Sequence, residues 1–76
     1  MNPSHLVKMA NQISDFFSAD SSEEEAAAEI ASHLQRFWAP AMRQRLAEAV
    51  EQGEAADLRP AACIAVRKLA LPAAQH

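Results

Sequence analysis

Apolar residues recur every three or four positions along most of this chain, which is the spacing that places them on one side of an α-helix. At the start, Asn2 and Pro3 form a typical helix beginning, because Asn caps the first turn and proline there loses no hydrogen bond. The pattern therefore predicts a helix over residues 3–18. Its expected core face consists of Leu6, Met9, Ala10, Ile13, Phe16 and Phe17.

A second helix is predicted over residues 22–38. Ser22 and Glu25 have the spacing of a capping box, so the acidic run around them is interpreted as helix-start chemistry and not as a catalytic or metal site. Pro40 disfavours helical backbone in the residue before it, which ends the helix near Trp38. The apolar face repeats the offsets of the first helix, so the two are expected to pack as an antiparallel pair. Its members are Ala27, Ile30, Ala31, Leu34, Phe37 and Trp38.

Two further helices are predicted over residues 40–52 and 58–70. Gly53 can take the left-handed conformation that ends a helix, and Asp57 is expected to cap the last helix, with Pro60 in its first turn. The expected core faces consist of Met42, Leu46, Ala49 and Val50 in the third helix, and of Leu58, Ala62, Ala65, Val66 and Leu69 in the fourth.

Ile64 and Leu71 lie away from the last of these faces, so a second apolar surface is expected to point outward, before a frayed tail at 72–76. One Gly, four Pro and many Ala favour helix throughout. The chain is therefore predicted to be a single all-α domain over 1–76, a small bundle of three to four short helices. A core of this size supplies at most about 3–5 kcal/mol, so a partner or a dimer is expected to stabilise it.

Charge and hydropathy exclude several classes of protein. The net charge of −3, together with Glu48 and Glu51 on the third helix, argues against a nucleic-acid-binding helix-turn-helix. No apolar run is long enough to span a membrane and no leader pattern opens the chain, so a cytoplasmic protein is expected. Three arginines, Arg36, Arg43 and Arg45, suit a partner carboxylate, a phosphate or simply solvent.

Candidate chemistry is sparse. Glu29 and His33 stand one helical turn apart, but no further ligand completes a metal site. The single Cys63 has an apolar sequence environment and no neighbouring base, so it is interpreted as a small buried or half-buried hydrophobe and not as a nucleophile. Asn11, Gln12 and His33 border the apolar faces, where they can bond a loop inside the domain or the backbone of a partner.

Two segments carry a family resemblance. They are Met9-Ala10-Asn11-Gln12-Ile13 with Phe16-Phe17, and Phe37-Trp38-Ala39-Pro40-Ala41-Met42-Arg43. Over Leu6 to Val50, the chain resembles the small delta subunit of cytoplasmic, NAD-dependent, molybdenum-containing formate dehydrogenases. It departs from the family at Ala39 and Ala41, where an acidic and a basic residue are usual.

The resemblance implies a non-catalytic accessory subunit that binds the large catalytic subunit and supports its assembly or stability. The enzyme resembled oxidises formate at a molybdenum or tungsten pterin centre and passes electrons through iron–sulfur clusters and FMN to NAD. None of these cofactors is expected in this chain, because one cysteine cannot hold a cluster. The alternative is a free-standing helical homodimer or regulatory module that uses Ile64 and Leu71 as a self-complementary patch.

The expected partner contacts centre on the junction between the second and third helices. Pro40 is predicted to fix the angle between the helices and Arg43 to reach a partner carboxylate. Trp38 is predicted to reach the surface as an anchor; the alternative is that it belongs to the core, as aromatic residues on a helical apolar face usually do. The other predicted contacts are Gln12, His33, Ile64 and Leu71.

Overall fold

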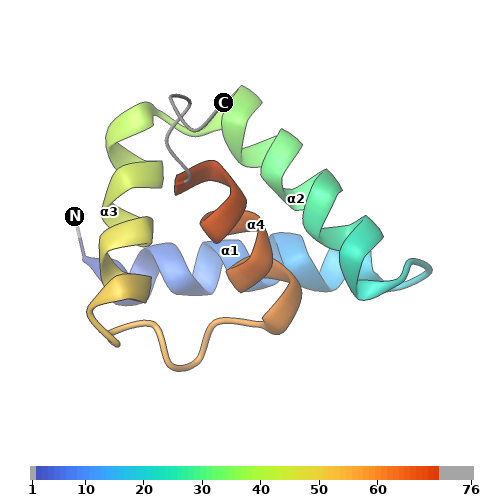
Figure 1. Cartoon of the computed structure of the whole chain (residues 1–76), viewed down its shortest axis with the longest axis horizontal. Coiled ribbons are helices and arrows are strands. Elements are labelled where there is room, and N and C mark those ends of the chain that lie inside the picture. The colour runs from blue at the N-terminus through green and yellow to red at the C-terminus, as the bar shows by residue number, and fades with distance from the viewer. Residues whose placement is uncertain (1, 71–76) are drawn as a thin grey trace.

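The computed structural model describes residues 2–70, which form four α-helices and contain no strand. The helices are α1 (Pro3–Ser18), α2 (Glu23–Phe37), α3 (Pro40–Glu51) and α4 (Pro60–Ala70). Figure 1 shows α4 in the middle of the molecule, with α1 behind it and α2 and α3 on either side. The predicted all-α class is confirmed, and α2 and α4 share the most extensive contact.

The first two helices begin as their sequences predict. Asn2 Oδ1 accepts a hydrogen bond from the Ser4 N–H at 2.9 Å, which caps α1. At α2 both bonds of the capping box form, since Ser22 Oγ accepts from the Glu25 N–H at 3.2 Å and Glu25 Oε1 accepts from the Ser22 N–H at 3.1 Å. Three otherwise unsatisfied donors at helix starts are thereby paired.

The end of α3 is fixed by Gly53. Its φ of 77° lies in the left-handed region that side chains disfavour. The Glu54 N–H donates to the Ala49 carbonyl at 2.8 Å and the Gly53 N–H to the Val50 carbonyl at 3.3 Å, which is the bonding of a Schellman motif. This motif closes the helix and turns the chain toward α4.

The start of α4 differs from the prediction, because the helix begins at Pro60 and Asp57 is not its N-cap. Asn11 on α1 holds the preceding residues: Asn11 Nδ2 donates to the Asp57 carbonyl at 3.0 Å, and Asn11 Oδ1 accepts from the Arg59 N–H at 2.8 Å. Arg59 Nε also donates to Asp15 Oδ1 at 3.1 Å. Of the two predicted roles for Asn11, binding a loop inside the domain or the backbone of a partner, the structure shows the first. Its side chain holds the α3–α4 loop against α1.

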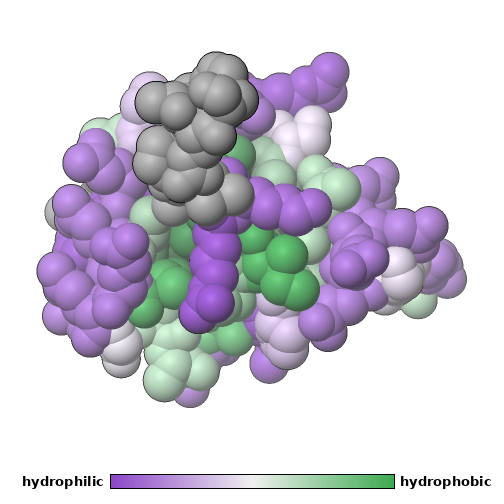
Figure 2. Space-filling model, viewed as in Figure 1, coloured by the Kyte–Doolittle hydropathy of each residue, from purple (hydrophilic) through white to green (hydrophobic). Residues whose placement is uncertain are grey.

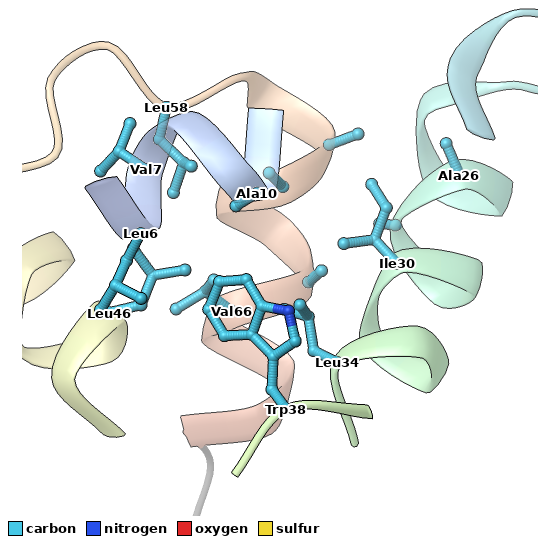
Figure 3. Packing of buried hydrophobic residues seen from close by; sticks show 14 residues of the cluster. Leu6, Val7, Ala10, Ala26, Ile30, Leu34, Trp38, Leu46, Leu58 and Val66 are labelled. Carbon is cyan, nitrogen blue, oxygen red and sulfur yellow. The ribbon is translucent and has the colours of Figure 1, made fainter. Parts of the chain in front are cut away.

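The core lies where all four helices converge, around α4 (Figure 3). Ala61, Ala62 and Ala65 on α4 are buried, and their small side chains let α2 approach closely. The larger buried members are Leu6, Val7, Ile30, Leu34, Trp38, Leu46, Leu58 and Val66.

Two predicted core residues do not belong to the core. Phe16 is 77% exposed and Phe37 is 71% exposed. On α1 the buried side includes Val7 and Ser14 and lies away from Phe16. Because Ser14 is polar, the apolar pattern of the sequence does not mark this side as buried. Phe37 is the last residue of α2, beyond the buried turns formed by Ile30 and its neighbours.

Candidate functional site

Trp38, the expected surface anchor, is in fact a core residue with 7% of its surface exposed. It follows α2 in an extended conformation, with φ −90° and ψ 142°, and its N–H donates to the Leu34 carbonyl at 3.0 Å. Figure 3 shows its indole ring pointing into the cluster toward Leu6, Leu46 and Val66. The prediction that Trp38 reaches the surface is therefore wrong, because the extended backbone before Pro40 turns this side chain inward.

Arg43 is half-buried and its guanidinium is occupied inside the domain. Nη1 donates to three carbonyls at the end of α2, those of Trp38 at 2.8 Å, Gln35 at 3.2 Å and Leu34 at 3.3 Å. A cation at this position complements both the unpaired carbonyls and the negative end of the α2 dipole. Arg43 therefore caps α2 across the junction, and the sequence pattern did not predict this role.

Pro40 is exposed and is the first residue of α3. A groove of about 420 Å³ lies beside it, between α3 and the last turns of α4. Its lining includes Arg43, Leu46, Val66 and Leu69, which already serve as a helix cap or pack in or against the core. The junction is thus mainly a structural element, with Pro40 at its surface.

The exposed aromatic side chains gather on α1 and α2. The Phe16 and Phe17 rings lie edge to face at 5.2 Å, the Phe17 and His33 rings at 6.0 Å, and the His33 and Phe37 rings at 4.8 Å between centroids. Four rings from two helices thus form one continuous row. We call this surface the aromatic face; it consists of Gln12, Ile13, Phe16, Phe17, His33 and Phe37.

Two shallow grooves follow the aromatic face. One, of about 310 Å³, is lined by Gln12, Ile13, Phe16, Phe17 and His33. The other, of about 300 Å³, is lined by Phe17, Glu29, Ser32, His33, Arg36 and Phe37. Burying one phenylalanine side chain contributes about 1.5–3 kcal/mol. A partner that covered both exposed phenylalanines would therefore gain hydrophobic free energy that the isolated domain does not have. Gln12 and His33 were both predicted as partner contacts, and the structure brings them together here.

The second apolar surface expected on α4 is reduced in the structure. Ile64 is half-buried and packs against the core, and Leu71 lies outside the described residues. Figure 2 shows hydrophobic side chains in the middle of one face, over α4, crossed by hydrophilic side chains and bordered by the hydrophilic surfaces of α3 and α2. Ile64 is therefore less exposed than Phe16 and Phe37 of the aromatic face.

The candidates for binding a metal ion or acting as a nucleophile are Glu29, His33 and Cys63. No group of three His, Cys, Asp or Glu side chains among residues 2–70 is placed to hold a metal ion. His33 packs between Phe17 and Phe37, while Glu29 is exposed beside it. Cys63 is half-buried, as predicted. Within that same stretch, no helix combines the length and the apolar character needed to cross a bilayer.

Comparisons with known proteins identify the family. Residues 5–66 of the 76 match the model of the NADH-dependent formate dehydrogenase delta subunit FdsD. A comparison with curated proteins gave no match, and neither did a comparison with solved structures. The matched segment begins in α1 and reaches Val66 in α4, so it includes both the junction and the aromatic face. This chain therefore belongs to the delta subunit family of NADH-dependent formate dehydrogenases.

Proposed function

We propose that this chain is a non-catalytic accessory subunit, which binds the large catalytic subunit of a cytoplasmic NAD-dependent formate dehydrogenase and supports its assembly or stability. The observation that carries the proposal is the family match over residues 5–66, since the family is described as a subunit of that enzyme. The four helices pack through a core of mainly apolar side chains, which is consistent with a small subunit built for binding.

The side chains also support a binding role over a catalytic one. Among residues 2–69 the buried residues are apolar except for Ser14, and the polar side chains of Asn11 and Arg43 hold a loop and a helix end in place. A hydrophobic surface large enough to need covering is a typical sign of a protein interface. Phe16 and Phe37 are two large hydrophobic side chains that the described residues leave exposed, and they support such an interface here.

We propose that the cofactors of the enzyme are held by its other subunits. An iron–sulfur cluster needs several thiolates, and the whole sequence contains one cysteine. We therefore expect the purified chain to contain no stoichiometric metal, flavin or pterin and to produce no NADH from formate and NAD. Elemental analysis, an absorption spectrum and an activity assay check this expectation. One firmly bound metal ion per chain would contradict it and would direct attention to Glu29 and His33.

The role in assembly is tested by producing the dehydrogenase with and without this chain. Without it, we expect a several-fold lower yield of assembled, cofactor-loaded catalytic subunit, or a correspondingly faster loss of activity on storage. The turnover number per loaded enzyme should stay the same, because the chain contributes no reacting group. Equal yield, loading and half-life in both preparations would refute the proposal, whereas an altered turnover number would show a direct part in catalysis.

A further inference from the structure

We infer that the aromatic face is the surface through which this chain binds the catalytic subunit, and that its occupant there is an amphipathic helix of that subunit. The inference rests on the proposed function, which names the partner but no contact surface. It replaces the junction as the expected contact, because Trp38 is buried and Arg43 is bonded inside the domain.

The shape of the surface favours a helical occupant. The row of rings crosses from α1 to α2, and two shallow, open grooves along it are lined by residues of these helices. Phe16 and Phe37 are the large hydrophobic side chains that the described residues leave exposed. An amphipathic helix places side chains three and four positions apart into a groove of this kind.

Two charged side chains beside the aromatic rings indicate which charges the bound helix carries. Glu29 and Arg36 are both exposed, both line the groove beside His33 and Phe37, and neither forms an ion pair with another described residue. They stand seven residues apart on α2, which is about 10 Å along the helix axis. The complementary helix therefore carries a basic residue opposite Glu29, an acidic residue opposite Arg36, and apolar side chains between the two.

A second copy of this chain is the competing occupant. An antiparallel α2 from another copy would also place an arginine opposite Glu29 and a glutamate opposite Arg36, as a two-fold axis requires. We assign the catalytic subunit, because the family is described as a subunit of a formate dehydrogenase and the proposed function of this chain is to bind the catalytic subunit of that enzyme.

The test measures the affinity of the purified chain for the purified, cofactor-loaded catalytic subunit. The double variant Phe16→Ala/Phe37→Ala should bind at least about tenfold more weakly than the wild type, as anchor residues do. Both side chains are exposed, so the variant should keep its circular dichroism spectrum and melting curve. Gln35→Ala is the matched control, since this residue is exposed on α2 outside the aromatic face and should bind as the wild type does.

Charge reversal tests the proposed polarity. Glu29→Arg and Arg36→Glu should each weaken binding, whereas Arg67→Glu, the same change at an exposed position on α4, should not. Equal effects at Arg36 and Arg67 would show general attraction between charged surfaces and would overturn the assigned occupant.

The remaining outcomes are distinguishable. If the wild type binds and the double phenylalanine variant binds equally well, the inference fails while the proposed function stands. If the wild type does not bind the catalytic subunit at all, the proposed function fails and the inference fails with it. If light scattering detects a dimer of the wild type that the double variant cannot form, and binding to the catalytic subunit is unaffected, the occupant is a second copy and the inference is overturned.

Discussion

Trp38→Ala should largely unfold the isolated domain at room temperature. The side chain is 7% exposed and points among Leu6, Leu46 and Val66, so its removal leaves a cavity at the meeting point of the helices. Truncating a buried tryptophan or phenylalanine costs about 3–5 kcal/mol, and a domain of this size is typically stable by no more than about that amount. A urea titration followed by far-UV circular dichroism measures the loss directly.

The neighbouring residue provides the control for this prediction. Phe37→Ala removes an exposed ring one position earlier and should change the free energy of unfolding by no more than about 0.5 kcal/mol. Trp38→Phe should retain most of the stability, because it keeps an aromatic ring in the cavity. Equal unfolding curves for Trp38→Ala and Phe37→Ala would contradict the placement of Trp38 in the core.

Arg43→Ala should lower the free energy of unfolding by about 1–3 kcal/mol, as expected when charged hydrogen bonds to helix-end carbonyls are lost. Its Nη1 donates to three carbonyls, and the shortest bond, to Trp38, is 2.8 Å. These bonds join α3 to the end of α2, so the loss should also loosen the junction that positions Trp38. The measurement is the same urea titration.

Arg45→Ala is the matched control on the same helix. The Arg45 side chain reaches Glu48 and Glu54 only at 3.9 and 3.8 Å, in pairs that are largely open to solvent. Such pairs contribute about 0–1 kcal/mol, so this variant should be nearly as stable as the wild type. A loss at Arg45 as large as that at Arg43 would contradict the capping role. Arg43→Lys should restore part of the stability, since one ammonium group can still reach a carbonyl.

The helices could be predicted well from local sequence, because capping or helix-breaking residues mark most of their ends. The Asn2 cap, the Ser22 capping box, Pro40 and Gly53 each act within a few residues of the boundary that they set. The start of α4 could not be predicted in this way. It depends on Asn11, which lies 46 residues before Asp57 in sequence and holds the loop by its side chain.

The candidate site was harder to predict than the helices. Ile30 and Phe37 stand seven residues apart, so a helical projection places them within about 20° of each other and cannot separate them. In the structure Ile30 is fully buried and Phe37 is 71% exposed, since only their positions along α2 differ. Phe37 was expected in the core and Trp38 at the surface, but Phe37 is exposed and Trp38 is buried. The reason is that the backbone changes from helical to extended between them.

Binding to the catalytic subunit is measured most directly by purifying the tagged chain from cells that also produce the other subunits of the dehydrogenase. We expect the catalytic subunit to elute with the wild-type chain at a fixed ratio and the eluate to reduce NAD with formate. We expect Phe16→Ala/Phe37→Ala to yield a folded chain without the catalytic subunit. Recovery of the wild-type chain alone, beside a fully active enzyme that assembled without it, would show that this chain is not a working subunit of the dehydrogenase.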